Sequence, residues 1–390
     1  MKEHPLFLRE DAVVVNGGIN ESLGYFCPSA YINGAIAHFG NPGREERLLK
    51  VGKAYTYLPH YALLEVSGDE RCQFLDALTT QSFSSLGMGK SSECCILDAQ
   101  GRIEYAAGVY VEEQAIFLIV ETSIVQKLLH FLLSMRFMMQ VDIRAYNDVV
   151  ILGTYGDFLD KYTDQAVCVW KDPWPYVCNN GTFYGPDTDK HPAKGLERKL
   201  YVFPSDISVS VVNELTEHDV PPSGMIAWEA VRISSARPSF ECEGKNVFPY
   251  ENDWIRTTTH LNKGCYKGQE TIAKTVNLGR APRRLTFFYL EGEIQELPAC
   301  GTPIMWNGRE AGWVTSSVRS ADEGPVALGI IRRVVPVDDI VDIGNYRAAQ
   351  GVICNAEGTS SVALKERPGK DLMNHELRTR SQGHGRLGIA

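Results

Sequence analysis

Apolar and polar residues follow two different periods along the chain, and together they predict a mixed fold of strands and helices. Between residues 60 and 145, helical spacing of apolar residues predicts helices over Asp69–Leu78 and Ser123–Met138. An apolar run covers Ala62–Ser67, and the other short runs predict strands at Glu93–Leu97, Arg102–Val111, Ala115–Glu121 and Val141–Arg144. Because hairpins are mixed with helices rather than strictly alternating with them, this block is predicted to be α+β.

The pattern changes twice further along the chain. Residues 146–280 carry weaker signals, with strand candidates at Val149–Leu152, Ala166–Trp170 and Lys199–Phe203 and helix candidates at Asp206–Leu215 and Met225–Ala236. From residue 283 onward β signals dominate, beginning with alternation over 284–289 and continuing through Trp313–Val318 and Val326–Val335. This last part predicts a small β-barrel or sandwich.

The length of 390 residues suggests two or three domains at about 150 residues each. The pattern divides the chain into a Gly- and Pro-rich lead-in segment (1–54), an α+β domain (55–145), a second α+β domain (146–280) and a β-barrel (281–364). The remaining residues, 365–390, are rich in Gly, Ser and Arg and are predicted to form a disordered tail.

Composition excludes several classes of protein. The chain is 44% hydrophobic and 22% charged, which is ordinary globular usage. Its net charge of −9 argues against general binding to nucleic acids or anionic membranes. No run of 18 apolar residues predicts a membrane span, and the N-terminus lacks the apolar block of a signal peptide. Ten cysteines without a C-x-x-C pair therefore favour reduced thiols in the cytoplasm.

The most informative stretch is Lys263-Gly264-Cys265-Tyr266-Lys267-Gly268-Gln269-Glu270. Its two glycines allow a tight backbone and close approach of a ligand or a neighbouring segment. Its cysteine lies between two lysines, whose ammonium groups would favour the thiolate if they were close to the sulfur. The same features also fit a structural turn around an unreactive cysteine. His260 lies five residues before Cys265, so a Cys/His nucleophile pair is a further alternative.

This octet resembles the K-G-C-Y-x-G-Q-E signature of the YgfZ family, a branch of the folate-binding proteins related to the glycine-cleavage T-protein. All seven specified positions match. The resemblance extends over roughly residues 35–350 and includes Val66-Ser67-Gly68, Phe74-Leu75, Leu78-Thr79-Thr80-Gln81, Leu97–Ile103, Trp228–Ile233, Pro249-Tyr250-Glu251 and Arg283-Arg284-Leu285. It implies a three-domain, T-protein-like ring around a central channel, with a small C-terminal β-barrel and tetrahydrofolate in the channel.

The resemblance also implies a set of folate contacts, since a folate combines a pterin, an aryl spacer and an anionic glutamate tail. Glu251 would bond the pterin, and Trp228 or Tyr266 would stack on a ring. Arg232 or Arg102 would pair with the tail carboxylates.

Each of these folate contacts has a structural alternative. Trp228 also fits a core position, Arg232 an internal salt bridge, and Arg102 a solvated or structural arginine. Gln269, within the octet, is counted with the folate contacts.

One departure from the T-protein pattern bears on activity. Aligned on Gly101, the position of the aspartate used in aminomethyl transfer holds Ala106. Glu104 is the nearest carboxylate, but it lies two residues away, roughly 6–7 Å along a strand. We therefore do not expect a true glycine-cleavage aminomethyltransferase.

The function implied by the resemblance is tetrahydrofolate-dependent assembly or repair of iron–sulfur enzymes. Cys265 is the expected reactive thiol, assisted by Lys263 and Tyr266, and iron–sulfur client proteins are the expected partners of a monomeric chain. The nine histidines show no metal-ligand spacing, so no metal site is predicted. Two alternatives remain: a folate-dependent aminomethyl- or methyl-transferase, and a folate-gated adaptor without catalysis.

Overall fold

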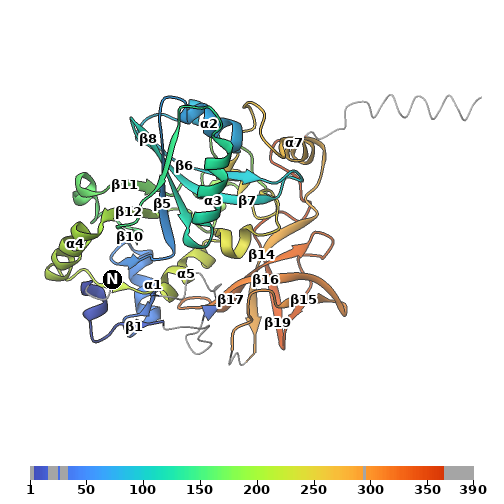
Figure 1. Cartoon of the computed structure of the whole chain (residues 1–390). Helices are drawn as coiled ribbons and strands as arrows, with labels where there is room; N and C mark the ends of the chain where they lie inside the picture. The colour runs from blue at the N-terminus through green and yellow to red at the C-terminus, as the bar shows by residue number, and fades with distance from the viewer. Residues whose placement is uncertain (1–3, 16–24, 27–33, 293–295, 364–390) are drawn as a thin grey trace, which may run out of the picture.

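The computed structural model describes residues 4–15, 25–26, 34–292 and 296–363, and three large sheets organise this part of the chain (Figure 1). The predicted tail at 365–390 and much of the predicted lead-in lie outside the described residues. A small pair of strands, β1 (Val13–Val14) and β3 (Ile36–His38), lies at the start of the chain, together with the short helix η1 (Pro5–Leu8).

The first sheet has the antiparallel order β6-β7-β8-β5-β9. Its strands are β5 (Tyr61–Ser67), β6 (Ser91–Leu97), β7 (Ile103–Val111), β8 (Ala115–Glu121) and β9 (Asp142–Ala145), and its helices are α2 (Arg71–Leu78), η4 (Phe83–Ser85) and α3 (Thr122–Met135). Helix α3 buries Ile124, Leu128 and Leu132, four residues apart, on the face that packs on the sheet. These elements match the predicted ones to within a few residues.

The second sheet has the order β11-β12-β10-β4-β13. Its strands are β4 (Tyr55–Tyr57), β10 (Val149–Thr154), β11 (Cys168–Lys171), β12 (Lys199–Pro204) and β13 (Pro222–Ser223), and the helical segments in this part are α1 (Pro42–Lys50), η5 (Asp160–Gln165), η6 (Thr188–Lys190), α4 (Ser205–Glu217) and α5 (Met225–Ser234). Strand β4 precedes the first sheet in sequence but pairs with β10, so the chain leaves the second sheet, builds the first and returns.

The C-terminal sheet closes on itself as a six-stranded barrel in the order β15-β18-β19-β14-β17-β16, with β15 paired to β16. Its strands are β14 (Arg283–Glu291), β15 (Pro303–Trp306), β16 (Arg309–Ser320), β17 (Gly324–Arg332), β18 (Val341–Ile343) and β19 (Tyr346–Val352), and β2 (Tyr25–Phe26) adds to β16. The predicted α+β fold with a small C-terminal β-barrel is confirmed.

The segment between the second sheet and the barrel joins the three parts. It contains the π-helix η7 (Phe240–Gly244), α6 (Ile255–Thr258) and α7 (Gln269–Leu278). Glu243 shows the connection: its carboxylate accepts hydrogen bonds from Arg232 of α5 (2.8 Å) and from Ser316 of β16 (2.7 Å). Figure 1 shows the first sheet at the top, the second at the left and the barrel at the lower right. Among the described helices, none combines the length and the apolar character needed to cross a membrane.

Candidate functional site

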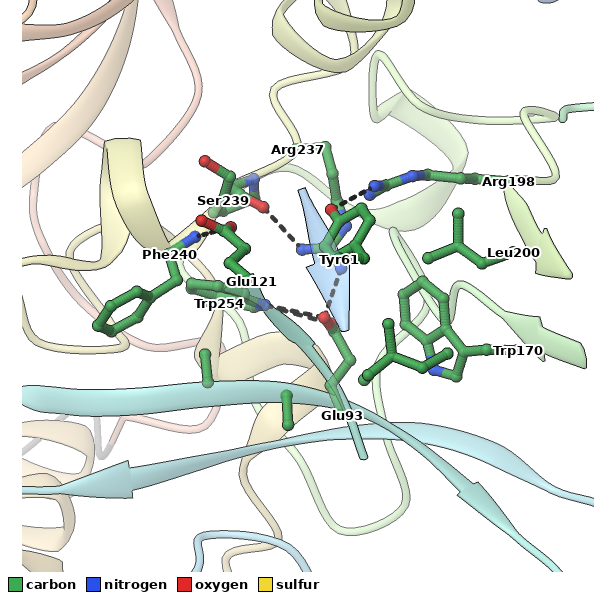
Figure 2. A pocket seen from close by; sticks show the side chains of 15 residues that line it. Tyr61, Glu93, Glu121, Trp170, Arg198, Leu200, Arg237, Ser239, Phe240 and Trp254 are labelled. Atoms are coloured by element: carbon green, nitrogen blue, oxygen red, sulfur yellow. Dashed lines mark hydrogen bonds and ion pairs between the residues drawn. The ribbon is translucent and has the colours of Figure 1, made fainter. Parts of the chain in front are cut away.

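A polar cavity lies where β6, β7 and β8 of the first sheet meet β11 and β12 of the second (Figure 2). Residues 237–240 and Trp254, which lie between α5 and the barrel in the chain, close its remaining side. Its volume of about 30 Å³ holds a water molecule or two. The rings of Tyr61, Trp170, Phe240 and Trp254 form part of its wall.

Two buried arginines, Arg198 and Arg237, line this cavity. Arg237 donates hydrogen bonds to Glu93 and to the Oδ2 atom of Asp172 (2.8 Å). Arg198 bonds the same Asp172 oxygen (3.2 Å) and the hydroxyl of Tyr61 (2.8 Å). Each arginine is 5% exposed or less, so both cations are compensated inside the protein rather than by solvent.

Glu93 enters the cavity from β6 and is held by donors from three directions. Besides Arg237, the Nε1 atom of Trp254 (3.2 Å) and the hydroxyl of Thr257 (2.5 Å) donate to its carboxylate. Burial raises the pKa of Glu93, and Arg237 acts in the opposite direction. Figure 2 shows its carboxylate directed at Arg237 and Trp254 across the cavity.

Glu121 stands at the end of β8 and has a different set of partners. Its two carboxylate oxygens accept the backbone N–H groups of Phe240 (2.8 Å) and Glu241 (3.0 Å). Within the described residues it takes part in no ion pair. Burial raises its pKa to about 7, because the effect of burial outweighs the opposite effect of the two backbone hydrogen bonds.

Ala106, where an aminomethyltransferase aspartate would be expected, lines this cavity from β7. Glu104, two residues earlier on the same strand, does not supply the missing carboxylate. Its side chain is partly exposed and accepts a hydrogen bond from Lys267 (3.2 Å). The cavity wall at β7 is therefore formed by small side chains.

The octet with the cysteine forms a second candidate site, at the surface. Cys265 is exposed and borders a hollow that is also lined by Asp76, Ala77, Ser82 and Lys263. Gly268 has a φ of +82°, and a Cβ there would lie 2.9 Å from the Cα of Gly101. The second glycine of the octet thus allows close packing on the turn at 98–101, which is the close approach of a neighbouring segment that the two glycines predicted.

The two lysines that flank Cys265 hold other partners. The ammonium of Lys263 donates to the backbone oxygens of Asp76 (2.8 Å), Thr79 (2.7 Å) and Gln81 (2.5 Å), near the C-terminal end of α2. Burial lowers its pKa to about 8. Lys267 bonds Glu104, as described above. The prediction that both ammonium groups favour the thiolate of Cys265 is therefore not supported by a direct contact between either lysine and the sulfur.

Tyr266 is buried beneath the hollow. The Lys263 ammonium lies 5.3 Å from the centre of its ring, and burial raises the pKa of its hydroxyl. Gln269 is half-buried at the start of α7, where its backbone N–H bonds the oxygen of Tyr266 (3.3 Å). The structure thus brings together Cys265, Lys263, Tyr266 and Gln269, as their closeness in sequence predicts.

The other predicted folate contacts lie apart from the polar cavity. Glu251 is fully buried and forms a two-pronged pair with Arg283 (2.7 Å for both contacts). Arg232 bonds Glu229 and Glu243 (2.8 Å each), which matches its structural alternative. Neither residue lines the cavity, so their contacts with folate stay predictions.

Trp228 and Arg102 also have protein partners. Trp228 is fully buried, with Arg198 4.8 Å from one ring of its indole and Tyr155 5.3 Å away. Arg102 is exposed, and its guanidinium lies 5.7 Å from the ring of Phe248. Through Arg198, Trp228 supports a residue of the cavity wall rather than lining the wall itself.

Sequence reasoning did not single out Glu93, Glu121, Arg198 or Arg237. These residues are far apart in the chain: Glu93 and Glu121 come from two strands of the first sheet, and Arg198 and Arg237 from two loops. The sequence signal that could have indicated these residues was a charged residue at the end of an apolar strand: Glu93 begins one predicted strand and Glu121 ends another. Among the described residues, no cluster of three or more His, Cys, Asp or Glu side chains is arranged to hold a metal ion.

No protein-family model matches the chain. Curated relatives do. The chain is 25% identical over 329 residues to an Arabidopsis thaliana protein named "Putative transferase At1g60990, chloroplastic", covering 80% of this chain and 73% of the relative. It is 22% identical over 292 residues to the "tRNA-modifying protein YgfZ" of Yersinia pestis, covering 73% of this chain and 86% of the relative. The chain is YgfZ-like.

The fold of this YgfZ-like chain also has a solved counterpart. The glycine cleavage system aminomethyltransferase T from Bartonella henselae superposes with a TM-score of 0.67 at 16% identity, over 87% of this chain and 96% of that protein. The predicted glycine-cleavage T-protein-like fold is therefore confirmed for the YgfZ-like chain.

Proposed function

We propose that this chain binds a reduced folate in the polar cavity and acts in the assembly or repair of iron–sulfur enzymes, with Cys265 as its reactive thiol. The observation that carries the folate assignment is the cavity itself. In this T-protein-like fold it lies between the first sheet, the second sheet and the segment that joins them to the barrel. It presents two buried arginines, two buried carboxylates and several aromatic rings.

The chemistry of the cavity wall fits the parts of a folate. Glu93 or Glu121 offers an acceptor to the N–H edge of a pterin, and Trp170 or Trp254 offers a flat apolar surface to its ring. Arg198 offers donors to the anionic tail. The present volume of about 30 Å³ is far below the several hundred that a ligand of this size needs. Binding therefore requires the wall side chains to move apart.

Titration calorimetry tests this assignment. We expect tetrahydrofolate to bind with a Kd in the micromolar range, on the order of −7 to −8 kcal/mol. We expect an exposed arginine variant, Arg102→Met, to retain that affinity if the ligand occupies the cavity rather than the surface at 102. Absence of binding heat, together with absence of thermal stabilisation by tetrahydrofolate, would contradict the folate assignment.

Cys265 is expected to be the first cysteine to react with an alkylating reagent at neutral pH. It is exposed beside an open hollow, and there is open space at Gly264 before it, where a Cβ would meet no atom within 4 Å. Cys300 is also exposed as a residue, but partial desolvation of its thiol raises the pKa of that thiol to about 11. Peptide mapping of the native protein after brief labelling measures the order of reaction. Labelling of Cys300 or of a buried cysteine ahead of Cys265 would remove the support for a nucleophile.

Replacement of Cys265 separates the main proposal from the adaptor alternative. Cys265→Ala is expected to fold and bind tetrahydrofolate like the parent but to lose the support of iron–sulfur enzyme activity in cells. Cys300→Ala serves as the matched control, because it also removes an exposed cysteine. If Cys265→Ala retains full cellular function while a variant with a blocked cavity loses it, the chain is a folate-gated adaptor without catalysis.

The aminomethyltransferase alternative has less support from the cavity. A carboxylate must lie within about 3 Å of the reacting nitrogen to exchange a proton with it. Ala106 offers none at the position of the transferase aspartate, and Glu104 is bonded to Lys267 at the surface. Glu121 lines the same cavity but enters it from β8, at a different position. We expect no formation of methylene-tetrahydrofolate from an aminomethyl-loaded carrier protein, with a true T-protein as control.

The cellular setting is part of the same proposal. The Yersinia relatives are named for tRNA modification, and the net charge of −9 favours an indirect role through a client enzyme over direct binding of tRNA. A cytoplasmic location, a monomeric state and iron–sulfur clients stay predictions. The Arabidopsis relative is named as chloroplastic, so the compartment can differ between relatives.

A further inference from the structure

The carboxylates around the polar cavity differ in how their charge is balanced. Glu93 and Asp172 both bond arginine: Glu93 pairs with Arg237, while Asp172 pairs with Arg237 and Arg198. Glu121 instead bonds two backbone N–H groups, and within the described residues no cation contacts its oxygens. It is 5% exposed. When ionised, Glu121 is stabilised by backbone dipoles alone. Its protonated form is therefore more favoured than those of Glu93 and Asp172, which pair with arginines.

The surroundings of Glu121 explain why it titrates near neutrality. From η7, Glu241 faces it and disfavours its negative charge, although Glu241 is itself bonded to Lys245 (2.5 Å) and to Ser123. From α5, Arg232 favours the charge, but its guanidinium is bonded to Glu229 and Glu243.

The remaining neighbours of Glu121 offset one another or have partners of their own. From β5, the hydroxyl of Tyr61 lies within its electrostatic range, and His60 precedes that residue. Across the cavity, Arg198 and Arg237 are paired with Asp172 and Glu93. Burial therefore decides the outcome, and the pKa of about 7 follows.

Glu121 also lies beside the part of the wall that has small side chains. Strands β7 and β8 pair in antiparallel register, with Gly108 opposite Ile119. The pairing ends there, two residues short of Ala106 and Glu121, and both of these residues line the cavity. A ligand in the opened cavity would thus border both the small side chains of β7 and the carboxyl group of Glu121.

We propose that Glu121 is the proton donor of the cavity, giving its carboxyl proton to a weakly basic ring nitrogen of the bound ligand. The inference rests on the proposed function, which makes this ligand a reduced pterin. The nitrogen lone pair takes the proton, and the O–H electron pair stays on Glu121. The resulting carboxylate remains held by the N–H groups of Phe240 and Glu241. No oxidant, reductant or further reactant is needed.

The pH dependence of tetrahydrofolate binding tests this role. Because the ligand takes its proton from protonated Glu121, the affinity should fall as the pH rises through the pKa of Glu121. Below about pH 6 Glu121 is protonated and the affinity should be constant. Above about pH 7 the competent fraction falls about tenfold per pH unit, so the Kd should be roughly 30-fold higher at about pH 8.5 than at about pH 6. Calorimetry in buffers with different heats of ionisation should show proton uptake rising toward about one per ligand over the same range.

Two variants complete the design. Glu121→Gln carries a neutral amide at all pH values and should bind tetrahydrofolate with a Kd that does not change with pH and without proton uptake. Glu104→Gln removes a carboxylate from neighbouring β7 outside the cavity and should retain the pH dependence of the parent. A flat pH profile in the parent, or the same profile in Glu121→Gln, would overturn the inference while leaving folate binding intact. Absence of binding at every pH would overturn the proposed function itself and, with it, this role for Glu121.

Discussion

Replacing Arg237 by methionine is expected to lower the free energy of unfolding by about 3–5 kcal/mol. The guanidinium is buried and bonds two carboxylates, those of Glu93 and Asp172. Methionine fills much of the same space but leaves Glu93 without a cation in an apolar environment. Denaturation by urea, followed by fluorescence, measures the change.

Two further variants show whether the loss comes from unbalanced charge. Arg102→Met removes an exposed guanidinium and should change the free energy of unfolding by less than about 0.5 kcal/mol. Adding Glu93→Gln to Arg237→Met should recover part of the stability, because the amide keeps an acceptor for Trp254 and Thr257 without a buried charge. Equal losses in the single and double variants would show that packing of Arg237, rather than its charge, is what stabilises the fold.

Replacing Ala106 by leucine is expected to weaken tetrahydrofolate binding by on the order of 100-fold or more, equivalent to about 3 kcal/mol. Ala106 lines a cavity of about 30 Å³, and three added carbon atoms would fill the space into which a pterin must open. Overpacking should cost about 1–3 kcal/mol of stability, which a folded chain of this size tolerates. Calorimetry with tetrahydrofolate measures the loss of affinity.

Ala77→Leu is the matched control for Ala106→Leu, because it adds the same atoms to the hollow beside Cys265. It should leave folate affinity unchanged and slow the alkylation of Cys265. Ala106→Leu should weaken folate binding and leave the rate of alkylation of Cys265 unchanged. A fall in folate affinity with Ala77→Leu would place the ligand at the hollow. Unchanged affinity in both variants would place it at neither site.

Local sequence patterns were sufficient to predict most of the secondary structure. The strands of the first sheet are apolar and bounded by turn residues, and α3 has a clear helical period. Prediction was weakest over residues 146–280, where short strands such as β13 are set by pairing with β4 rather than by their own composition. It also missed helix α1 in the predicted lead-in segment and strands β15, β18 and β19 of the barrel. Pairing between distant segments has no local signature, so the place of β4 in the second sheet could not be anticipated.

The two sites differ in how far the sequence could predict them. The predicted residues of the surface site belong to one octet, so they are neighbours in sequence and in space. The cavity is built by single charged residues from separate strands and loops, which meet only after the sheets have packed. Arg232 illustrates the limit: the family resemblance implied a contact with the folate tail, but its partners Glu229 and Glu243 lie within the protein. Charge alone does not distinguish a ligand contact from an internal pair.

A crystal structure of the protein with tetrahydrofolate bound tests the central claim most directly. The account predicts a pterin over Ala106, between Glu93 and Glu121, with the rings of the cavity wall displaced outward and Cys265 still exposed in its hollow. Density for the ligand in the hollow beside Cys265, or an unchanged cavity in crystals grown at saturating tetrahydrofolate, would contradict it.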